Sequence, residues 1–175
     1  MRPIFKTNLR TINTEVKSWV RKATMGIEYA LKRKGPITMA ASLGTGFLKT
    51  HPNLETPDIY FHIQTFSANN AVEGSHPFSA FTTSVLQLRP ESKGFLKLKS
   101  ADSRVYPAIH PNYLATTKDQ TTIVKGIQIA RKIASFDPLK SHISEEYAPG
   151  RDIAFDDEAG TLESVSYTHL RAHET

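Results

Sequence analysis

Apolar residues recur at three- and four-residue steps in two stretches of the chain, and this spacing predicts two amphipathic helices. The first helix is predicted over residues 14–34, where Asn13 can cap the start and Gly35-Pro36 ends the pattern. We expect its apolar stripe to face the core. The stripe consists of Val16, Trp19, Val20, Ala23, Ile27, Ala30 and Leu31.

The second helix is predicted to begin at Thr117, with Gln120 three residues later in a capping-box spacing, and to end near Asp137-Pro138. Its apolar stripe consists of Ile123, Ile127, Ala130 and Ala134. A short helical turn is predicted over residues 139–143. The acidic segment 145–163 is expected to open a further helix near Asp156.

Alternation of side-chain types predicts a strand over residues 57–66. The face that we expect to meet the core consists of Ile59, Phe61, Ile63 and Thr65. The opposite face consists of Tyr60, His62, Gln64 and Phe66. Because this second face mixes aromatic and polar side chains, two interpretations stay open. It lines a pocket, or it is a half-exposed sheet face on which His62 is hydrogen-bonded.

Further strands are predicted on both sides of this one. Residues 46–50 form a short strand after a glycine-broken segment, in which Gly44 and Gly46 indicate close packing against the backbone. Residues 79–88 and 95–100 are predicted to pair as a hairpin, because proline and glycine bound the turn between them. The second strand of this hairpin, with alternating leucine and lysine, is expected to have one solvated face.

The order of these elements, a helix, several antiparallel strands and then helices, predicts an α+β fold with helices on one face of an antiparallel sheet. A length of 175 residues favours a single domain. Hydrophobic residues make up 39% and charged residues 22%, which is ordinary for a globular protein. The chain contains no cysteine, so disulfides and thiolate metal sites are excluded.

The net charge of +5 is unevenly distributed, with basic residues concentrated in residues 1–34 and acidic residues in residues 145–163. Nucleic-acid binding would explain a basic start, and so would a solvated helix face beside an acidic segment of the same protein. We favour the second interpretation, because the aromatic residues are too scattered for a stacking platform. No signal peptide or transmembrane segment is visible, which is compatible with a cytoplasmic location.

The last eleven residues, "VSYTHLRAHET", differ in character from the preceding chain. They resemble the conceptual translation of a transposon-end adapter used to prepare sequencing libraries. We therefore expect residues 1–164 to form a partial domain and residues 165–175 to be a non-native tail.

Four segments occur in an order that resembles the glucose–methanol–choline (GMC) oxidoreductases, with choline-dehydrogenase-like and alcohol dehydrogenases as the nearest members. They are "GPITMAASLGTGFLKT", "PDIYFHIQ", "LRPESKGFLKLKSAD" followed by "PAIHPNYL", and "IVKGIQIARKI". The resemblance extends from Arg2 to about Glu163. It implies a substrate-binding domain, an antiparallel sheet with flanking helices that lies over FAD held by another domain.

The resemblance implies a parent enzyme that oxidises the CH–OH group of a primary alcohol by hydride transfer to FAD, with a histidine as proton acceptor. The GxGxxG fingerprint for FAD is absent from this chain. The family's catalytic histidine lies in an "HP-GT" motif, whereas Tyr167-Thr168-His169 lacks the following proline and glycine. We therefore expect no catalytic, cofactor-binding or metal-binding residue here. The missing flavin-binding domain would be the partner, and the chain alone would be inactive.

The resemblance places the strand that contains His62 and Gln64 next to the substrate, so both are candidate substrate-binding residues. Relatives that act on cationic substrates carry an acidic residue near the segment that matches Ser42, Leu43 and Gly44. The absence of an acid there favours an uncharged alcohol over a quaternary ammonium compound. Two other functions stay open, a stand-alone binding domain and a basic nucleic-acid-binding protein.

Overall fold

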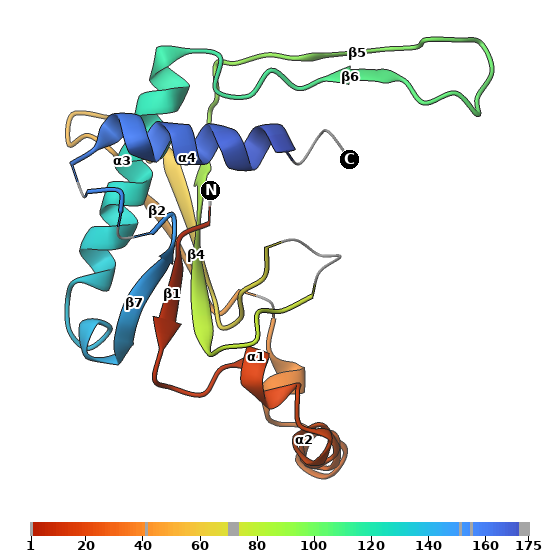
Figure 1. Ribbon diagram of the computed structural model, residues 1–175, viewed down its shortest axis with the longest axis vertical. Helices are drawn as coiled ribbons and strands as arrows, with labels where there is room; N and C mark the ends of the chain where they lie inside the picture. The colour runs from red at the N-terminus through yellow and green to blue at the C-terminus, as the bar shows by residue number, and fades with distance from the viewer. Residues whose placement is uncertain (1, 41, 70–73, 151, 155, 172–175) are drawn as a thin grey trace.

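An antiparallel sheet of five strands, in the order β2-β3-β4-β1-β7, forms the centre of the molecule (Figure 1). The computed structural model describes residues 2–40, 42–69, 74–150, 152–154 and 156–171. The strands of the central sheet are β1 (Ile4–Thr7), β2 (Gly44–Leu48), β3 (Ile59–Gln64), β4 (Ala80–Gln87) and β7 (Ile143–Ala148). Two further strands, β5 (Phe95–Lys97) and β6 (Ala108–His110), form a separate arm that projects from the body.

The helices lie outside this sheet. They are α1 (Ile12–Glu15), α2 (Trp19–Lys32), α3 (Thr117–Ala134) and α4 (Glu158–Arg171), with 3-10 turns at Pro36–Thr38 and Lys140–His142. Helix α3 packs on one face of the sheet, against β3 and β4, and α4 contacts α3. The predicted α+β class, with helices on one face of an antiparallel sheet, is confirmed. Among the described residues, no helix combines the length and the apolar character that crossing a membrane requires.

The core lies between α3 and the sheet, where Ile59, Phe61, Val85 and Ala130 form one buried cluster. Ile123 and Ile127 are also buried, so the predicted apolar stripe of α3 is confirmed. The cap differs by one residue from the prediction. The N-cap is Thr116, whose hydroxyl accepts a hydrogen bond from the Asp119 N–H group. Gln120 instead donates to the Leu114 carbonyl.

The predicted hairpin between residues 79–88 and 95–100 is wrong. Strand β4 already has β3 on one edge and β1 on the other, so no edge is left for β5, which pairs with β6 instead. The prediction that only one face of this segment is solvated is also wrong, because all three residues of β5 are exposed. Residues 101–114, which follow this segment, contain a turn and β6.

The turn after β4 is held by the buried carboxylate of Asp119, at the start of α3. It accepts hydrogen bonds from the Glu91 N–H at 2.9 Å, the Ser92 N–H at 2.7 Å, the Ser92 hydroxyl and the Gln87 side-chain amide at 2.8 Å. Burial alone raises the pKa of Asp119. The hydrogen bonds from Ser92, Glu91 and Gln87 outweigh burial and lower the pKa below its usual range. The carboxylate therefore stays ionised and fixes the end of β4 to α3.

The predicted helix over residues 14–34 is broken into α1 and α2, and its orientation differs from the prediction. Asn13 does not cap it. The side chain of Asn13 is buried and donates to the carbonyls of Ser67 and Phe78, and Ser18 caps α2. No residue of α2 is buried, and Trp19 is 82% exposed. The predicted core position of Trp19 and its stripe is therefore wrong, because the connection through Ser18 turns that face to solvent.

Two strands that the sequence pattern did not reveal, β1 and β7, complete the sheet. Strand β2 begins at Gly44, two residues before the predicted start. Nothing approaches Gly46 within contact distance, and Gly44 has only an ordinary contact with Ile63, so the expected close packing at these glycines is wrong. The predicted strand β3 and the short turn at Lys140–His142 are confirmed, and α4 begins two residues after Asp156.

At Gly126, α3 approaches the sheet closely, and Gly126→Ala tests this contact. An added Cβ would lie 2.5 Å from Cγ1 of the fully buried Val85, so we expect overpacking to cost about 1–3 kcal/mol in urea unfolding. Gly26→Ala is the matched control, because its Cβ would meet nothing within 4 Å in α2. There the higher helix propensity of alanine is expected to add about 0.5–1 kcal/mol. Equal gains in both variants would contradict the close contact.

Replacing Asp119 with alanine leaves the amide groups of Glu91, Ser92 and Gln87 without their acceptor. We expect a loss of about 2–4 kcal/mol in the free energy of unfolding at pH 7. Because the folded state lowers the pKa of Asp119, its stabilisation is complete above the unfolded pKa of about 4 and is lost as the pH falls below it. The free energies of unfolding of the unaltered protein and of the Asp119→Ala variant should therefore converge as the pH falls from 5 to 2. The exposed Asp137, replaced by alanine, should change neither the midpoint nor its pH dependence.

Candidate functional site

The face of the sheet opposite α3 carries both predicted substrate-binding residues. In β3, Tyr60, His62 and Gln64 alternate with the core residues Ile59 and Phe61, so they belong to this second face. No described helix has more than marginal contact with the sheet from this side. We call it the open face.

The register of the strands places polar side chains in a row across the open face. His62 pairs with Thr45 of β2 on one side and with Ser84 of β4 on the other. Directly paired residues of antiparallel strands share a face, so these three side chains are neighbours. Next to this row, the ring of Tyr60 stacks on Phe47 at 4.7 Å between centroids. An imidazole flanked by hydroxyl groups, with an aromatic wall beside it, can hold a small polar molecule by hydrogen bonds.

His62 is half-buried and its ring is fixed from two directions. Its Nδ1 atom lies 2.8 Å from the Ser42 hydroxyl, and its ring meets that of Tyr60 edge to face at 4.1 Å. Within the described part of the chain, Nε2 has no hydrogen-bond partner. The ring is therefore held by one nitrogen while the other can donate to, or accept from, a bound molecule.

Gln64 is also half-buried and lies two residues further along the same face. Its Oε1 atom accepts a long hydrogen bond of 3.5 Å from the hydroxyl of Ser84. The fold thus brings together Ser42, His62, Gln64 and Ser84 from three neighbouring stretches of chain. Sequence reasoning selected His62 and Gln64 and missed Ser84, which only the pairing of β3 with β4 reveals.

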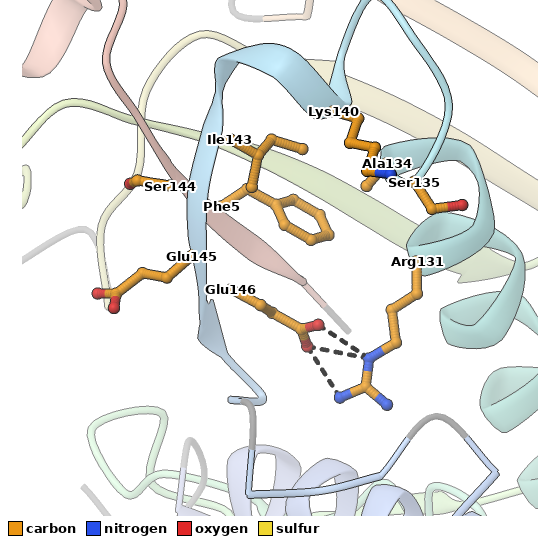
Figure 2. A pocket seen from close by; sticks show the side chains of 9 residues that line it. All are labelled: Phe5, Arg131, Ala134, Ser135, Lys140, Ile143, Ser144, Glu145 and Glu146. Atoms are coloured by element: carbon orange, nitrogen blue, oxygen red, sulfur yellow. Dashed lines mark hydrogen bonds and ion pairs between the residues drawn. The ribbon is translucent and has the colours of Figure 1, made fainter.

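A shallow pocket of about 210 Å³ lies on the other face of the sheet, between α3, the turn after it and β7 (Figure 2). Its lining includes Phe5, Ala134, Lys140 and Ile143 as well as an ion pair. In this ion pair, Arg131 and Glu146 point toward one another, with Nη2 and Oε1 2.9 Å apart. Arg131 also donates to the carbonyls of Gly150 and Ala154.

The buried Arg131–Glu146 pair is therefore fully hydrogen-bonded and ties α3 to β7, which makes it a structural rather than a substrate-binding group. Sequence reasoning did not select it. The available signal was the position of Arg131, four residues after Ile127 on the apolar stripe of α3. A charged residue at a core position indicates a buried partner.

A second buried polar group lies beside β4. His76 is hydrogen-bonded through Nδ1 to the Ser67 hydroxyl at 2.9 Å and through Nε2 to Oδ1 of Asn69 at 2.8 Å. Ser67 in turn exchanges hydrogen bonds with the side chain of Asn13. Both ring nitrogens of His76 are occupied, so this histidine fixes the loop and is not available to a ligand. No group of three or more potential metal ligands occurs within the described residues.

Solved structures with the same fold are flavoenzymes. A formate oxidase of Aspergillus oryzae RIB40 superimposes with a TM-score of 0.77 at 17% identity, covering 94% of this chain and 33% of that chain. An FAD-dependent oxidoreductase from Chaetomium thermophilum gives a TM-score of 0.65 at 15% identity, covering 93% of this chain and 35% of that chain. These similarities define the fold of the chain.

Sequence comparison identifies the family. Residues 90–174 match the GMC oxidoreductase family. The chain is 31% identical over 153 residues to "Alcohol dehydrogenase [acceptor]" of Pseudomonas putida, which covers 86% of this chain and 28% of that protein. It is 32% identical over 142 residues to mitochondrial choline dehydrogenase of Mus musculus, covering 79% of this chain and 23% of that protein. The match over residues 90–174 assigns this segment to the GMC oxidoreductase family and confirms the resemblance that the sequence motifs indicated.

The chain spans about a quarter of the length of these curated relatives. The family match reaches residue 174 and overlaps the segment 165–175. The origin of that segment from an adapter therefore stays a prediction.

Proposed function

We propose that the chain is the substrate-binding domain of an FAD-dependent oxidoreductase that acts on the CH–OH group of alcohols. The family and the names of the relatives, alcohol and choline dehydrogenases, support this assignment. The arrangement of the open face supports a substrate-binding role for this domain.

The proposal rests on one observation. Two segments that the sequence resemblance places near the substrate are in direct contact. Residues 42–44 and 62–64 are 20 positions apart, and they lie side by side at the start of the β2–β3 pairing. The Leu43 N–H donates to the Ile63 carbonyl at 2.9 Å, and Ser42 contacts His62 at 2.8 Å. In this proposal, Nε2 of His62 and the amide of Gln64 hold the hydroxyl group of the alcohol.

FAD itself does not fit the residues of this chain. A dinucleotide pyrophosphate is held by a glycine-rich turn that opens a helix directly after a strand. Here the glycines Gly44 and Gly46 lie within β2, which leads through a turn into β3. We therefore assign FAD binding to a further part of the polypeptide. This chain contributes the alcohol side of the site, and the isolated chain is expected to have no oxidoreductase activity.

The segment Ser42–Leu43–Gly44 also supports the substrate class. None of these residues carries a charge, and the exposed, apolar Leu43 lies close to His62, because its N–H group donates to the carbonyl of the neighbouring Ile63. A quaternary ammonium group is stabilised by a carboxylate, which this segment lacks, whereas an alkyl chain gains from contact with leucine. We therefore propose an uncharged aliphatic alcohol as the substrate.

His62→Ala tests the binding role in a polypeptide that joins this domain to its FAD-binding domain. Loss of one hydrogen bond to the alcohol is expected to raise KM about tenfold. His51→Ala is the matched control, because His51 is exposed and lies away from the open face. Initial rates over a range of alcohol concentrations measure the effect. An unchanged KM in the His62 variant would remove this residue from the substrate site.

The substrate preference is tested by comparing choline with aliphatic primary alcohols of similar size. We expect kcat/KM to be higher for the uncharged alcohols. Leu43→Glu places a carboxylate beside His62 and is expected to shift the ratio toward choline about tenfold or more, as a new charge pair near a protein surface would. Faster choline oxidation by the unaltered protein would refute the proposed substrate class, while leaving the family assignment intact.

A further inference from the structure

Helix α2 has its apolar side turned outward. Along the helix, one face collects the apolar residues and the opposite face carries charged side chains. Only Met25, Gly26 and Tyr29 are partly covered by the protein. The apolar stripe is exposed to the extent of 82% at Trp19, 70% at Val20, 57% at Ile27 and 78% at Leu31. An amphipathic helix gains its stability by burying such a stripe, so this surface requires an apolar partner.

The flanks of the stripe are strongly basic. Residues 17–34 contain six basic residues and one acidic residue, Glu28. The basic residues are Lys17, Arg21, Lys22, Lys32, Arg33 and Lys34. Most of this charge has no acidic partner on the helix. The only ion pair that involves α2 within the described residues joins Arg21 to Glu15 at 3.6 Å.

The helix also occupies an extremity of the molecule. Figure 1 shows α2 at one end of the long axis, with α4 and the β5–β6 arm at the other end. Among the described helices and strands, its main contacts are made to the adjacent 3-10 turn, Pro36–Thr38. Its outward side can therefore meet a flat surface without obstruction by the sheet.

We propose that α2 is a membrane-surface helix, which lies along an anionic phospholipid bilayer. In this arrangement the stripe enters the headgroup boundary, Trp19 anchors one end, and the lysines and arginines contact lipid phosphates. The 14 residues span only about 21 Å, less than the hydrocarbon thickness of about 30 Å, so the helix lies in the plane of the surface. This function is independent of the alcohol chemistry of the open face.

The charge pattern favours a lipid surface over another protein domain. Protein interface cores are depleted of lysine, because its charge is costly to remove from water. Here cations border the apolar stripe at both ends of the helix. At a bilayer, long lysine side chains extend to the anionic headgroups while their methylene groups cover apolar surface. The composition of α2 therefore fits a bilayer better than the dry centre of a domain interface.

The single tryptophan of the chain makes the test direct, because Trp19 is its own fluorescent probe. Adding vesicles of phosphatidylcholine and phosphatidylserine, in a ratio of 7 to 3, should shift the emission to shorter wavelength, and brominated lipids should quench it. Vesicles of phosphatidylcholine alone should bind at least tenfold more weakly. An unshifted spectrum at millimolar anionic lipid would overturn the proposal.

Substitutions of two leucines with similar exposure, one in α2 and one on the arm, test which surface binds the vesicles. Leu31 in α2 is 78% exposed and Leu98 on the arm is 80% exposed, so neither substitution disturbs a core. We expect Leu31→Asp to weaken cosedimentation with anionic vesicles at least tenfold and Leu98→Asp to leave it unchanged. Lys32→Gln and Lys34→Gln should each weaken binding about fivefold. Circular dichroism melting curves confirm that every variant is folded.

Three results would refute the membrane role. The first is equal loss of binding in the Leu31 and Leu98 variants. The second is a blue shift of Trp19 that depends on protein concentration without lipid, which would assign the stripe to a second copy of the chain. The third is protection of Trp19 from aqueous quenchers by the FAD-binding domain of the same polypeptide, which would assign it to a domain interface. None of these outcomes depends on alcohol turnover, so the proposed enzymatic function is tested separately.

Discussion

The carboxylate of Asp119 determines how the chain leaves the central sheet. It accepts hydrogen bonds from the end of β4, from both residues of the following turn and from the Ser92 hydroxyl, while its own residue opens α3. A strand, a turn and a helix are thereby joined at one buried charge. The direction given to α3 brings Gly126 against Val85 and closes the core. Because α3 covers one face of the sheet, the other face is left for His62 and Gln64.

The elements that could be predicted are those in which the pattern of apolar residues fits one buried face. The apolar stripe of α3 and the alternation in β3 each predicted one buried face, and both predictions are correct. The stripe of α2 has the same form, and there the prediction failed. Periodicity shows that a helix has an apolar face but does not identify its partner. Strands β1 and β7 escaped detection because they are only four and six residues long and carry polar side chains on both faces, so they show no clear alternation. The hairpin failed because free strand edges are a property of the whole sheet.

The candidate site was predictable only in part, for a similar reason. His62 and Gln64 stood out as polar residues on an otherwise strand-forming segment. Ser42 and Ser84 become part of the site only through pairing of β3 with its two neighbours. Conversely, two buried and hydrogen-bonded groups, at Arg131 and His76, lie outside the open face and hold the scaffold. A polar residue whose hydrogen-bonding atoms are all occupied within the protein thus has a structural role, whereas one with a free atom can bind a ligand.

The place of β1 in the sheet has a consequence for how the protein is made. This strand lies between β4 and β7, and Phe5 pairs with Phe81 on one side and with Glu146 on the other. During synthesis at about 5–20 residues per second, β1 emerges before both of its neighbours and must wait several seconds for β4 and longer for β7. Closing such long loops slows folding and leaves strand edges uncovered meanwhile. The growing chain is therefore expected to depend on chaperones until β7 has left the ribosome.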